Sequence, residues 1–94
     1  MVRMRRRPPV LRPLALRDVT IVVLNWNGRD VTLACLDSLS RAELGGATVL
    51  VVDNGSRDGS LEAIRERFPS VATLSLAENL GYAGGNNAGI RWAI

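Results

Sequence analysis

The chain has 94 residues, of which 47% are hydrophobic and only 4% aromatic, so one small domain with an aliphatic core is expected. It contains no histidine, which excludes histidine bases and histidine metal ligands, and its single cysteine excludes an intramolecular disulfide. The net charge of +3 is uneven, because residues 1–17 carry six of the twelve arginines and no acid, whereas residues 18–94 carry all nine acids.

Residues 1–17 are rich in Arg and Pro, and we expect them to form a disordered tail. Prolines and arginines interrupt the apolar residues of this segment, which argues against a signal peptide, and no later stretch reaches the roughly 20 apolar residues of a membrane span. A weak contact of the tail with an anionic membrane is a further interpretation. Nucleic acid is not expected as a partner, because the rest of the chain is acidic. The lone thiol fits a reduced, cytoplasmic location.

The first element predicted after the tail is a strand over 19–24, a β-branched apolar run without alternation, as in strands that are covered on both faces. Asn25 begins a turn. A helix is predicted over 30–43 and ends at Gly45-Gly46. Its buried face is expected to include Cys35 as a small apolar side chain. The full set expected on that face is Val31, Ala34, Cys35 and Leu39.

A second buried strand is predicted over 48–52, and the helix after it can be capped by Asp58 or Ser60. A shorter third strand is predicted over 71–76, and a last helix is expected to begin near Gly84. The resulting β-α-β-α-β-α order predicts a three-layer α/β fold with a parallel sheet and right-handed crossovers.

Three polar segments follow the three predicted strands, and we call them the first (25–28), second (53–58) and third (78–87) polar segments. In open parallel sheets, ligands bind at the carboxyl ends of the strands, so this coincidence predicts a binding site. Asp53 directly follows four apolar residues. Its carboxylate can accept hydrogen bonds from a nucleobase or a ribose, although the same residue type also caps turns.

The third polar segment combines glycines with asparagines. Glycines at a helix N-terminus let backbone N–H groups approach a phosphate, but close packing of a helix on a sheet also needs small residues, and both interpretations stay open. Trp26 either stacks on a base or covers the core, with the core slightly favoured. The first polar segment reads Asn-Trp-Asn-Gly, which is neither a Walker loop nor a dinucleotide fingerprint.

At these three segments the sequence resembles family 2 glycosyltransferases with the GT-A fold. Residues 22–27 are similar to the family's opening strand with its terminal Tyr/Trp-Asn pair, and 51–60 to its Val-Asp-Asp-Gly-Ser-x-Asp-Gly-Ser/Thr motif. Residues 78–90 are similar to Asn-x-Gly-x-x-x-Ala-Arg-Asn-x-Gly-Ile. Asn54 replaces the second Asp of many members and Asn86 replaces their Arg, as in a subset related to rhamnosyl- and galactofuranosyltransferases.

The resemblance implies that residues 18–94 form the N-terminal, Rossmann-like half of a truncated GT-A domain that binds a nucleotide-diphosphate sugar, with dTDP or UDP as the nucleotide. It implies sugar transfer to a hydroxyl of a glycan or lipid-linked acceptor in cell-wall or surface polysaccharide synthesis, at the inner face of the membrane. It also implies a set of residues around the nucleotide-sugar: Asn25, Asn27, Asp53, Asn54, Asn79, Gly81, Asn86 and Asn87.

The family holds Mg²⁺ or Mn²⁺ with an Asp-x-Asp motif on a fourth strand, and a later carboxylate acts as the base in inverting members. Neither feature occurs in these 94 residues, so no catalytic or metal-binding residue is predicted and the chain alone is expected to be inactive. One alternative is a non-enzymatic fragment that binds a nucleotide or a partner. Another is a protein whose basic tail binds nucleic acid or a membrane, which the acidic charge of the rest of the chain disfavours. The family's strand order, 3-2-1-4, would leave the first strand with an exposed apolar edge that invites association.

Overall fold

A computed structural model of the chain describes residues 2–4 and 15–94. The strands are β1 (Val2–Met4), β2 (Val19–Asn25), β3 (Thr48–Asn54) and β4 (Ala72–Leu76). The helices are α1 (Arg29–Ser40), α2 (Ser60–Arg67) and α3 (Gly81–Ala93), and a short 3-10 turn, Leu16–Asp18, precedes β2. From β2 onward, the predicted β-α-β-α-β-α order is confirmed.

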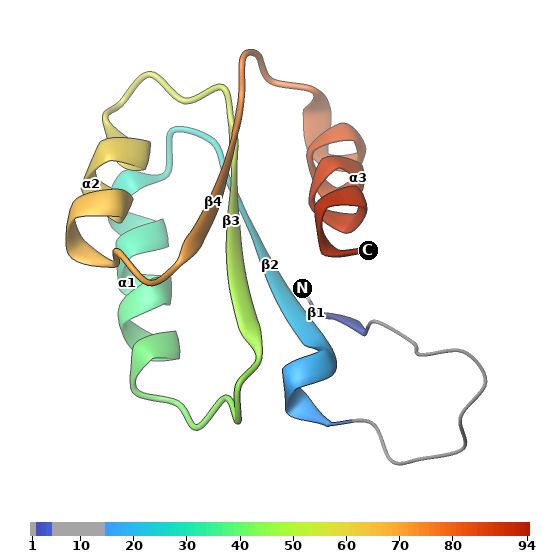
Figure 1. The fold of residues 1–94 in the computed structure, drawn as a ribbon. Coiled ribbons are helices and arrows are strands. Elements are labelled where there is room, and N and C mark those ends of the chain that lie inside the picture. Colours follow the sequence, from blue (N-terminus) through green and yellow to red (C-terminus); the bar gives the residue numbers. More distant parts are fainter. Residues whose placement is uncertain (1, 5–14) are drawn as a thin grey trace.

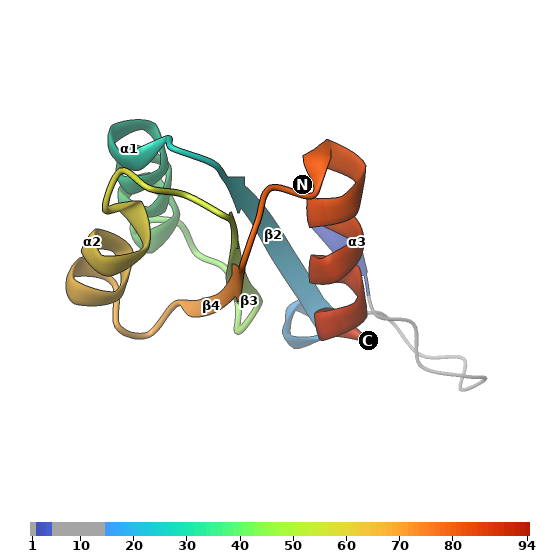
Figure 2. The same ribbon diagram turned by 90° about the horizontal axis from the view of Figure 1, so that it is seen from above.

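The four strands form one sheet in the order β1-β2-β3-β4 (Figure 1). β2, β3 and β4 are parallel to one another, and β1 pairs antiparallel with β2. Helices α1 and α2 cover one face of the sheet, while α3 covers the other (Figure 2). The predicted three-layer arrangement with a parallel sheet is therefore confirmed, and β1 adds an antiparallel strand at one edge.

Strand β3 lies at the centre of the core, because its side chains pack into the hydrophobic clusters on both faces of the sheet. Val51 is fully buried and packs with a cluster on the α1 and α2 side that includes Leu36 and Ile64. Leu50 and Val52, also fully buried, belong to a second cluster with Val22. Burial on both faces explains why the strand sequences are unbroken apolar runs.

The predicted buried face of α1 is wrong except at Leu39, which is partly buried. Val31 is 78% exposed, and Ala34 and Cys35 are exposed as well, so the expected burial of the thiol is also wrong. The residues that α1 buries are Thr32, Leu33 and Leu36. Leu33 and Leu36 are larger than Ala34 and Cys35 and pack in the core, and on the same face the hydroxyl of Thr32 donates a 2.6 Å hydrogen bond to Asn25.

Helix α3 begins at Gly81, three residues before the expected start near Gly84, so most of the third polar segment is helical. A Cβ atom on Gly85 would lie 2.6 Å from the Cδ1 atom of Leu24, and one on Gly89 would lie 2.9 Å from the Cγ1 atom of Val22. Both distances are too short for a carbon–carbon contact. For these two glycines the structure therefore supports close packing of the helix on the sheet.

The segment expected to be a disordered tail, residues 1–17, is described only in part, and 5–14 lie outside the described residues. The structure differs from the expectation at Val2–Met4, which pair with β2 in the register Val2↔Ile21 and Met4↔Val19. The physical reason is that the edge of β2 offers N–H and C=O groups that an extended segment can satisfy. Across the described ranges, no helix has the length and apolar character that a membrane crossing needs.

Candidate functional site

The carboxyl ends of β2 and β3 lie side by side, because the parallel register pairs Asn25 with Asp53. The side chain of Asn25 is 1% exposed. Its Nδ2 donates to the Oδ1 of Asp53 at 2.9 Å and to the Oγ of Ser56 at 3.1 Å. Its Oδ1 accepts the hydrogen bond from Thr32. A buried amide in this position joins β2, α1 and the second polar segment.

Asp53 is 3% exposed and holds the centre of this arrangement. Besides the bond from Asn25, its Oδ2 accepts a hydrogen bond from the backbone N–H of Ser56 at 3.3 Å. An ionised carboxylate has about four acceptor positions. Two of these are used inside the protein, so about two remain for the N–H or O–H groups of a ligand.

The first and second polar segments are further bonded to each other by Asn27. Its backbone N–H donates to the Oγ of Ser56 at 2.9 Å, and its Oδ1 accepts from the backbone N–H of Arg57 at 2.8 Å. The backbone N–H of Arg29 donates to the Oδ2 of Asp58 at 3.1 Å. These bonds make the two segments one connected surface at the end of the sheet.

Helix α2 begins at Ser60 and its N-cap residue is Gly59, so the prediction that Asp58 or Ser60 is the cap is wrong at that position, although Asp58 bonds to the first helical residue. The Oδ1 of Asp58 accepts hydrogen bonds from the hydroxyl of Ser60 and, at 3.0 Å, from the backbone N–H of Ser60. The hydroxyl bond is the main cause that lowers the pKa of Asp58 from its ordinary value, with the backbone N–H groups of Ser60 and Arg29 acting in the same direction. These hydrogen bonds favour the ionised carboxylate of Asp58, which is the last residue of the second polar segment.

The third polar segment is attached to β3 by Asn54, which is 2% exposed. Its Oδ1 accepts from the backbone N–H of Leu80 at 2.8 Å, and its Nδ2 donates to the carbonyl oxygen of Gly81 at 3.1 Å. The Oδ1 of Asn79 accepts from the N–H of Gly81 at 2.7 Å. Gly55 has a φ of +76°, and a Cβ atom there would lie 2.7 Å from the backbone of Glu78.

The structure thus brings six of the eight predicted site residues into two hydrogen-bonded groups at this edge of the sheet. The first contains Asn25, Asn27 and Asp53, which are joined through Ser56. The second contains Asn54, Asn79 and Gly81. The other two lie further along α3. Asn86 is 5% exposed, and its Oδ1 has no hydrogen-bond partner among the described residues. Asn87 is exposed to solvent.

The indole of Trp26 is 56% exposed, so the interpretation of this side chain as a cover for the core is wrong. It stands in the first polar segment between two asparagines, and Tyr82, at the start of α3, is 74% exposed. Sequence reasoning did not single out Ser56 and Thr32, whose hydroxyls complete the network around Asn25. Serine and threonine are so common at turns and helix ends that residue type alone did not reveal them.

The described residues contain no group of three or more Cys, Asp or Glu side chains placed to hold a metal ion. Asp53 is a single carboxylate at its strand end, and each of its oxygens accepts one hydrogen bond within the protein.

Comparisons with known proteins agree with this arrangement. The sequence pattern of glycosyl transferase family 2 matches residues 20–94. The chain belongs to glycosyl transferase family 2. It is therefore related to enzymes that transfer sugars, and its α/β architecture is a Rossmann-like part of the GT-A fold, as the motifs in its three polar segments indicated.

Two curated members of the family are N-acetylglucosaminyl-diphospho-decaprenol L-rhamnosyltransferases of Mycobacterium tuberculosis, strains CDC 1551 / Oshkosh and ATCC 25618 / H37Rv. Each is 47% identical over 47 residues, which is 50% of this chain and 15% of the relative. Among solved structures, the mannosyltransferase PcManGT from Pyrobaculum calidifontis, in complex with GDP-Man and Mn²⁺, is similar with a TM-score of 0.68 and 28% identity. That match covers 80% of this chain and 24% of the mannosyltransferase.

Proposed function

We propose that this chain forms the donor-nucleotide site of a glycosyltransferase that moves a sugar from a nucleotide-diphosphate sugar to a hydroxyl acceptor. The observation that carries the proposal is the bonded network at the carboxyl ends of β2 and β3, with Asp53 at its centre. Ligands of open α/β sheets bind at this edge. Membership of glycosyl transferase family 2 supports the same chemistry.

Within this site, Asp53 accepts hydrogen bonds from the base or the ribose through the acceptor positions that the protein leaves open. Asn25 and Ser56 hold its carboxylate in place, so these two act as positioning residues. The exposed indole of Trp26 offers a flat apolar face on which a base can stack. Asn27 and Asn54 line the nucleotide from the first and second polar segments.

The diphosphate lies toward the start of α3, where Asn79 and Gly81 meet the site and Asn86 and Asn87 follow on the helix. The N-terminus of a helix of 13 residues favours a negative charge through its dipole and its unpaired N–H groups. Gly81 has a φ of +77°. No atom lies within 4 Å of the position that a Cβ atom would take there, so the space beside its backbone is open.

Sugar transfer also requires neutralisation of the leaving diphosphate and a base for the acceptor hydroxyl. In the family a divalent cation supplies the first, and the described residues contain no group of three or more Cys, Asp or Glu side chains that could hold one. We therefore propose that residues 1–94 bind the nucleotide without transferring sugar. Together with the boundaries proposed above, residues 18–94 form the donor-binding unit and residues 1–17 lie outside it.

We propose a lipid-linked glycan of the cell wall as the acceptor of the whole enzyme, which the N-acetylglucosaminyl-diphospho-decaprenol in the name of the rhamnosyltransferases supports. We propose a dTDP- or UDP-sugar as donor from the resemblance to rhamnosyl- and galactofuranosyltransferases. A mannosyltransferase solved in complex with GDP-Man makes GDP the nucleotide to compare with them. For an acceptor of this kind we propose a cytoplasmic location, at the inner face of the membrane.

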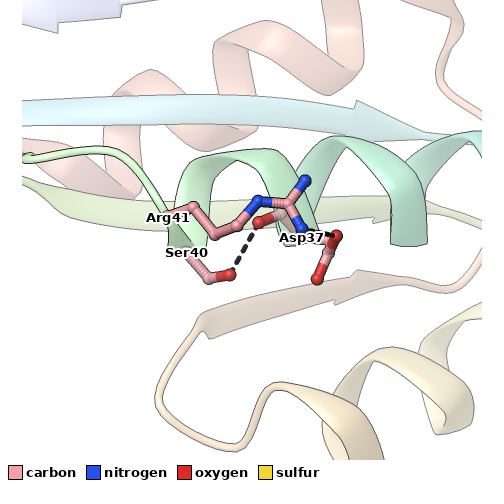
Figure 3. Close-up of polar contacts among 3 residues, drawn as sticks. All are labelled: Asp37, Ser40 and Arg41. Carbon is pink, nitrogen blue, oxygen red and sulfur yellow. Dashed lines mark hydrogen bonds and ion pairs between the residues drawn. The ribbon is translucent and has the colours of Figure 1, made fainter.

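The test is calorimetric titration of the full chain with dTDP, UDP and GDP, each without metal, comparing Asp53→Asn with Asp37→Asn. Asp37 carries the same charge but lies on α1, where it pairs with Arg41 at 2.7 Å and its backbone carbonyl accepts from Ser40 (Figure 3). We expect Asp53→Asn to weaken binding at least about tenfold, the loss of about one charged hydrogen bond. We expect Asp37→Asn to leave binding unchanged.

Equal affinities of wild type and Asp53→Asn for all three nucleotides would contradict the proposal, provided that circular dichroism shows both variants folded. Binding lost equally in Asp37→Asn would point to a general effect of charge instead.

A further inference from the structure

The sequence contains two Asn-Gly pairs, Asn27-Gly28 in the first polar segment and Asn54-Gly55 in the second. An asparagine before a glycine is prone to lose its side-chain amide, because the glycine has no side chain to hinder attack by its own backbone nitrogen. The two pairs consist of the same residue types. A difference in their reactivity is therefore expected to come from the structure around them.

This reaction, deamidation, replaces the side-chain amide by a carboxylate and consumes only water. The backbone nitrogen of the glycine gives its proton to water or hydroxide and bonds to the Cγ atom of the asparagine, which closes a succinimide ring. The bond between Cγ and Nδ2 breaks, and Nδ2 leaves as ammonia after taking a proton from water. Water then breaks one of the two C–N bonds of the ring, which leaves either aspartate or isoaspartate.

Asn27 is exposed to solvent and lies outside the helices and strands, so water reaches it to take one proton and supply another. Its Oδ1 accepts the hydrogen bond from the backbone N–H of Arg57 at 2.8 Å. Negative charge develops on this oxygen during the attack, and the N–H stabilises it. The attacking nitrogen belongs to Gly28, the N-cap residue of α1, whose N–H takes no part in the helical hydrogen bonds.

Asn54 has the same kind of bond at its Oδ1 but differs at the leaving group. It is 2% exposed and is the last residue of β3. Its Nδ2 donates to the carbonyl oxygen of Gly81 at 3.1 Å, and a carbonyl cannot supply the proton that departing ammonia needs. A Cβ atom on Gly55 would lie 2.7 Å from the backbone of Glu78, so this glycine is enclosed. Reaction at Asn54 therefore requires a local opening of the fold.

We propose that Asn27 is a site of spontaneous deamidation and that the fold protects Asn54 from the same reaction. The carboxylate formed at position 27 keeps an oxygen that accepts from Arg57, but it adds a negative charge to the site. Isoaspartate also adds one carbon atom to the backbone between the N–H groups of Asn27 and Arg29, which bond to Ser56 and Asp58. The modification therefore weakens the bonding between the first and second polar segments.

The test is peptide mapping by mass spectrometry after the folded full chain has been incubated at mildly alkaline pH in water enriched in heavy oxygen. Trypsin cleaves after arginine and releases residues 18–29 and 42–57 as separate peptides, each with one Asn-Gly pair. Digestion in ordinary water ensures that heavy oxygen marks only the products formed in the folded protein. We expect Asn27 to deamidate at least about tenfold faster than Asn54.

The same measurement in concentrated urea is the matched control, because unfolding removes the structure and keeps the sequence. There the two rates are expected to agree within about threefold. Asn27→Gln is the matched variant, since the longer side chain would have to close a larger ring. Labelling at position 27 should then disappear while the rate at Asn54 stays unchanged.

Equal rates at the two pairs in the folded chain would overturn the proposal, and so would a difference that persists in urea, which would assign it to the neighbouring residues. A consequence for ligand binding rests on the proposed function: the aged chain should bind dTDP and UDP more weakly than fresh chain, whereas the affinity of Asn27→Gln should not change with ageing. Peptide mapping needs no ligand, so a chain that deamidates at Asn27 but binds no nucleotide would contradict the proposed function alone.

Discussion

The side-chain amide of Asn25 makes three hydrogen bonds in the site, and we expect their loss to lower the stability of the fold. It donates to Asp53 and Ser56 and accepts from Thr32, and the exposed fraction of its side chain is 1%. Glutamine is too long for this position, and aspartate cannot donate to the carboxylate of Asp53. An asparagine after a buried strand is therefore required by the network itself, apart from any contact with a ligand.

Replacing Asn25 by alanine should lower the free energy of unfolding by about 2–4 kcal/mol, because the buried oxygen of Asp53 and the hydroxyl of Thr32 each lose a partner. Urea denaturation followed by circular dichroism measures the change. Asn87→Ala is the matched control, since Asn87 is exposed and its replacement should alter stability by less than about 0.5 kcal/mol. A loss below about 1 kcal/mol in Asn25→Ala would show that the network does not hold the segments together.

At the scale of elements, two glycines let helix α3 pack close to the sheet. Gly85 and Gly89 lie on the side that contacts β2 and β3, where Leu24, Val22 and Val52 are the nearest side chains. A glycine in a helix costs about 1 kcal/mol relative to alanine. Here that cost is offset by the closeness of the helix to the sheet, which puts the start of α3 beside the second polar segment.

Gly89→Ala tests this packing. The added Cβ atom would lie 2.9 Å from Val22 and 3.0 Å from Val52, on two sides at once. We expect overpacking of about 1–3 kcal/mol to exceed the gain in helix propensity, so thermal unfolding should occur at a lower temperature. Arg91→Ala, on the exposed side of α3, serves as the control and should shift the midpoint little. A stabilised Gly89→Ala would mean that the helix has room to move outward.

The elements also show where sequence reasoning succeeds and where it fails. The three parallel strands, β2, β3 and β4, were predicted to within two residues because unbroken aliphatic runs have few alternatives to a two-sided burial, whereas β1 was not predicted. The buried face of α1 was predicted wrongly, because Val31, Ala34 and Cys35 are apolar at helical spacing yet face solvent. The buried face instead contains Leu33 and Leu36, together with Thr32, a polar residue whose hydrogen-bond partner lies seven positions earlier in the chain.

At the scale of the whole molecule, β3 couples the two halves of the core. Its successive residues belong alternately to the cluster under α1 and α2 and to the cluster on the α3 face. Removing side chains from one cluster should therefore weaken the contacts of the other face through the shared strand. The molecule is expected to unfold as one cooperative unit.

Val51→Ala checks this coupling. Val51 is fully buried on the side of α1 and α2, and its truncation should cost about 2 kcal/mol. In a Trp26→Phe background, the fluorescence of Trp92 reports on α3, on the opposite face. We expect the Trp92 transition and the circular dichroism transition to move to lower denaturant together. Two separate midpoints would show that α3 unfolds independently of the layer formed by α1 and α2.

The gathering of these polar residues at one edge of the sheet was predictable, because parallel strands bring their carboxyl ends to one edge and the polar residues follow those ends. The bonds among them were not. Ser56 lies three residues after Asp53 and turns back to both Asn25 and Asn27, a geometry that depends on the loop path rather than on residue type. Asn86 was expected near phosphate, and its unpartnered buried oxygen is a feature that no sequence pattern indicates.

The side chain of Asn54 has a consequence for the electrostatics of the site. It donates to the carbonyl of Gly81 and accepts from the N–H of Leu80, and an amide can do both, whereas the carboxylate of an aspartate at this position could only accept. The start of α3 is therefore bonded to β3 by the neutral side chain of Asn54. A diphosphate bound here as proposed would meet one negative charge fewer than it would beside a pair of aspartates. Less electrostatic repulsion between the diphosphate and the protein would then have to be neutralised by a cation.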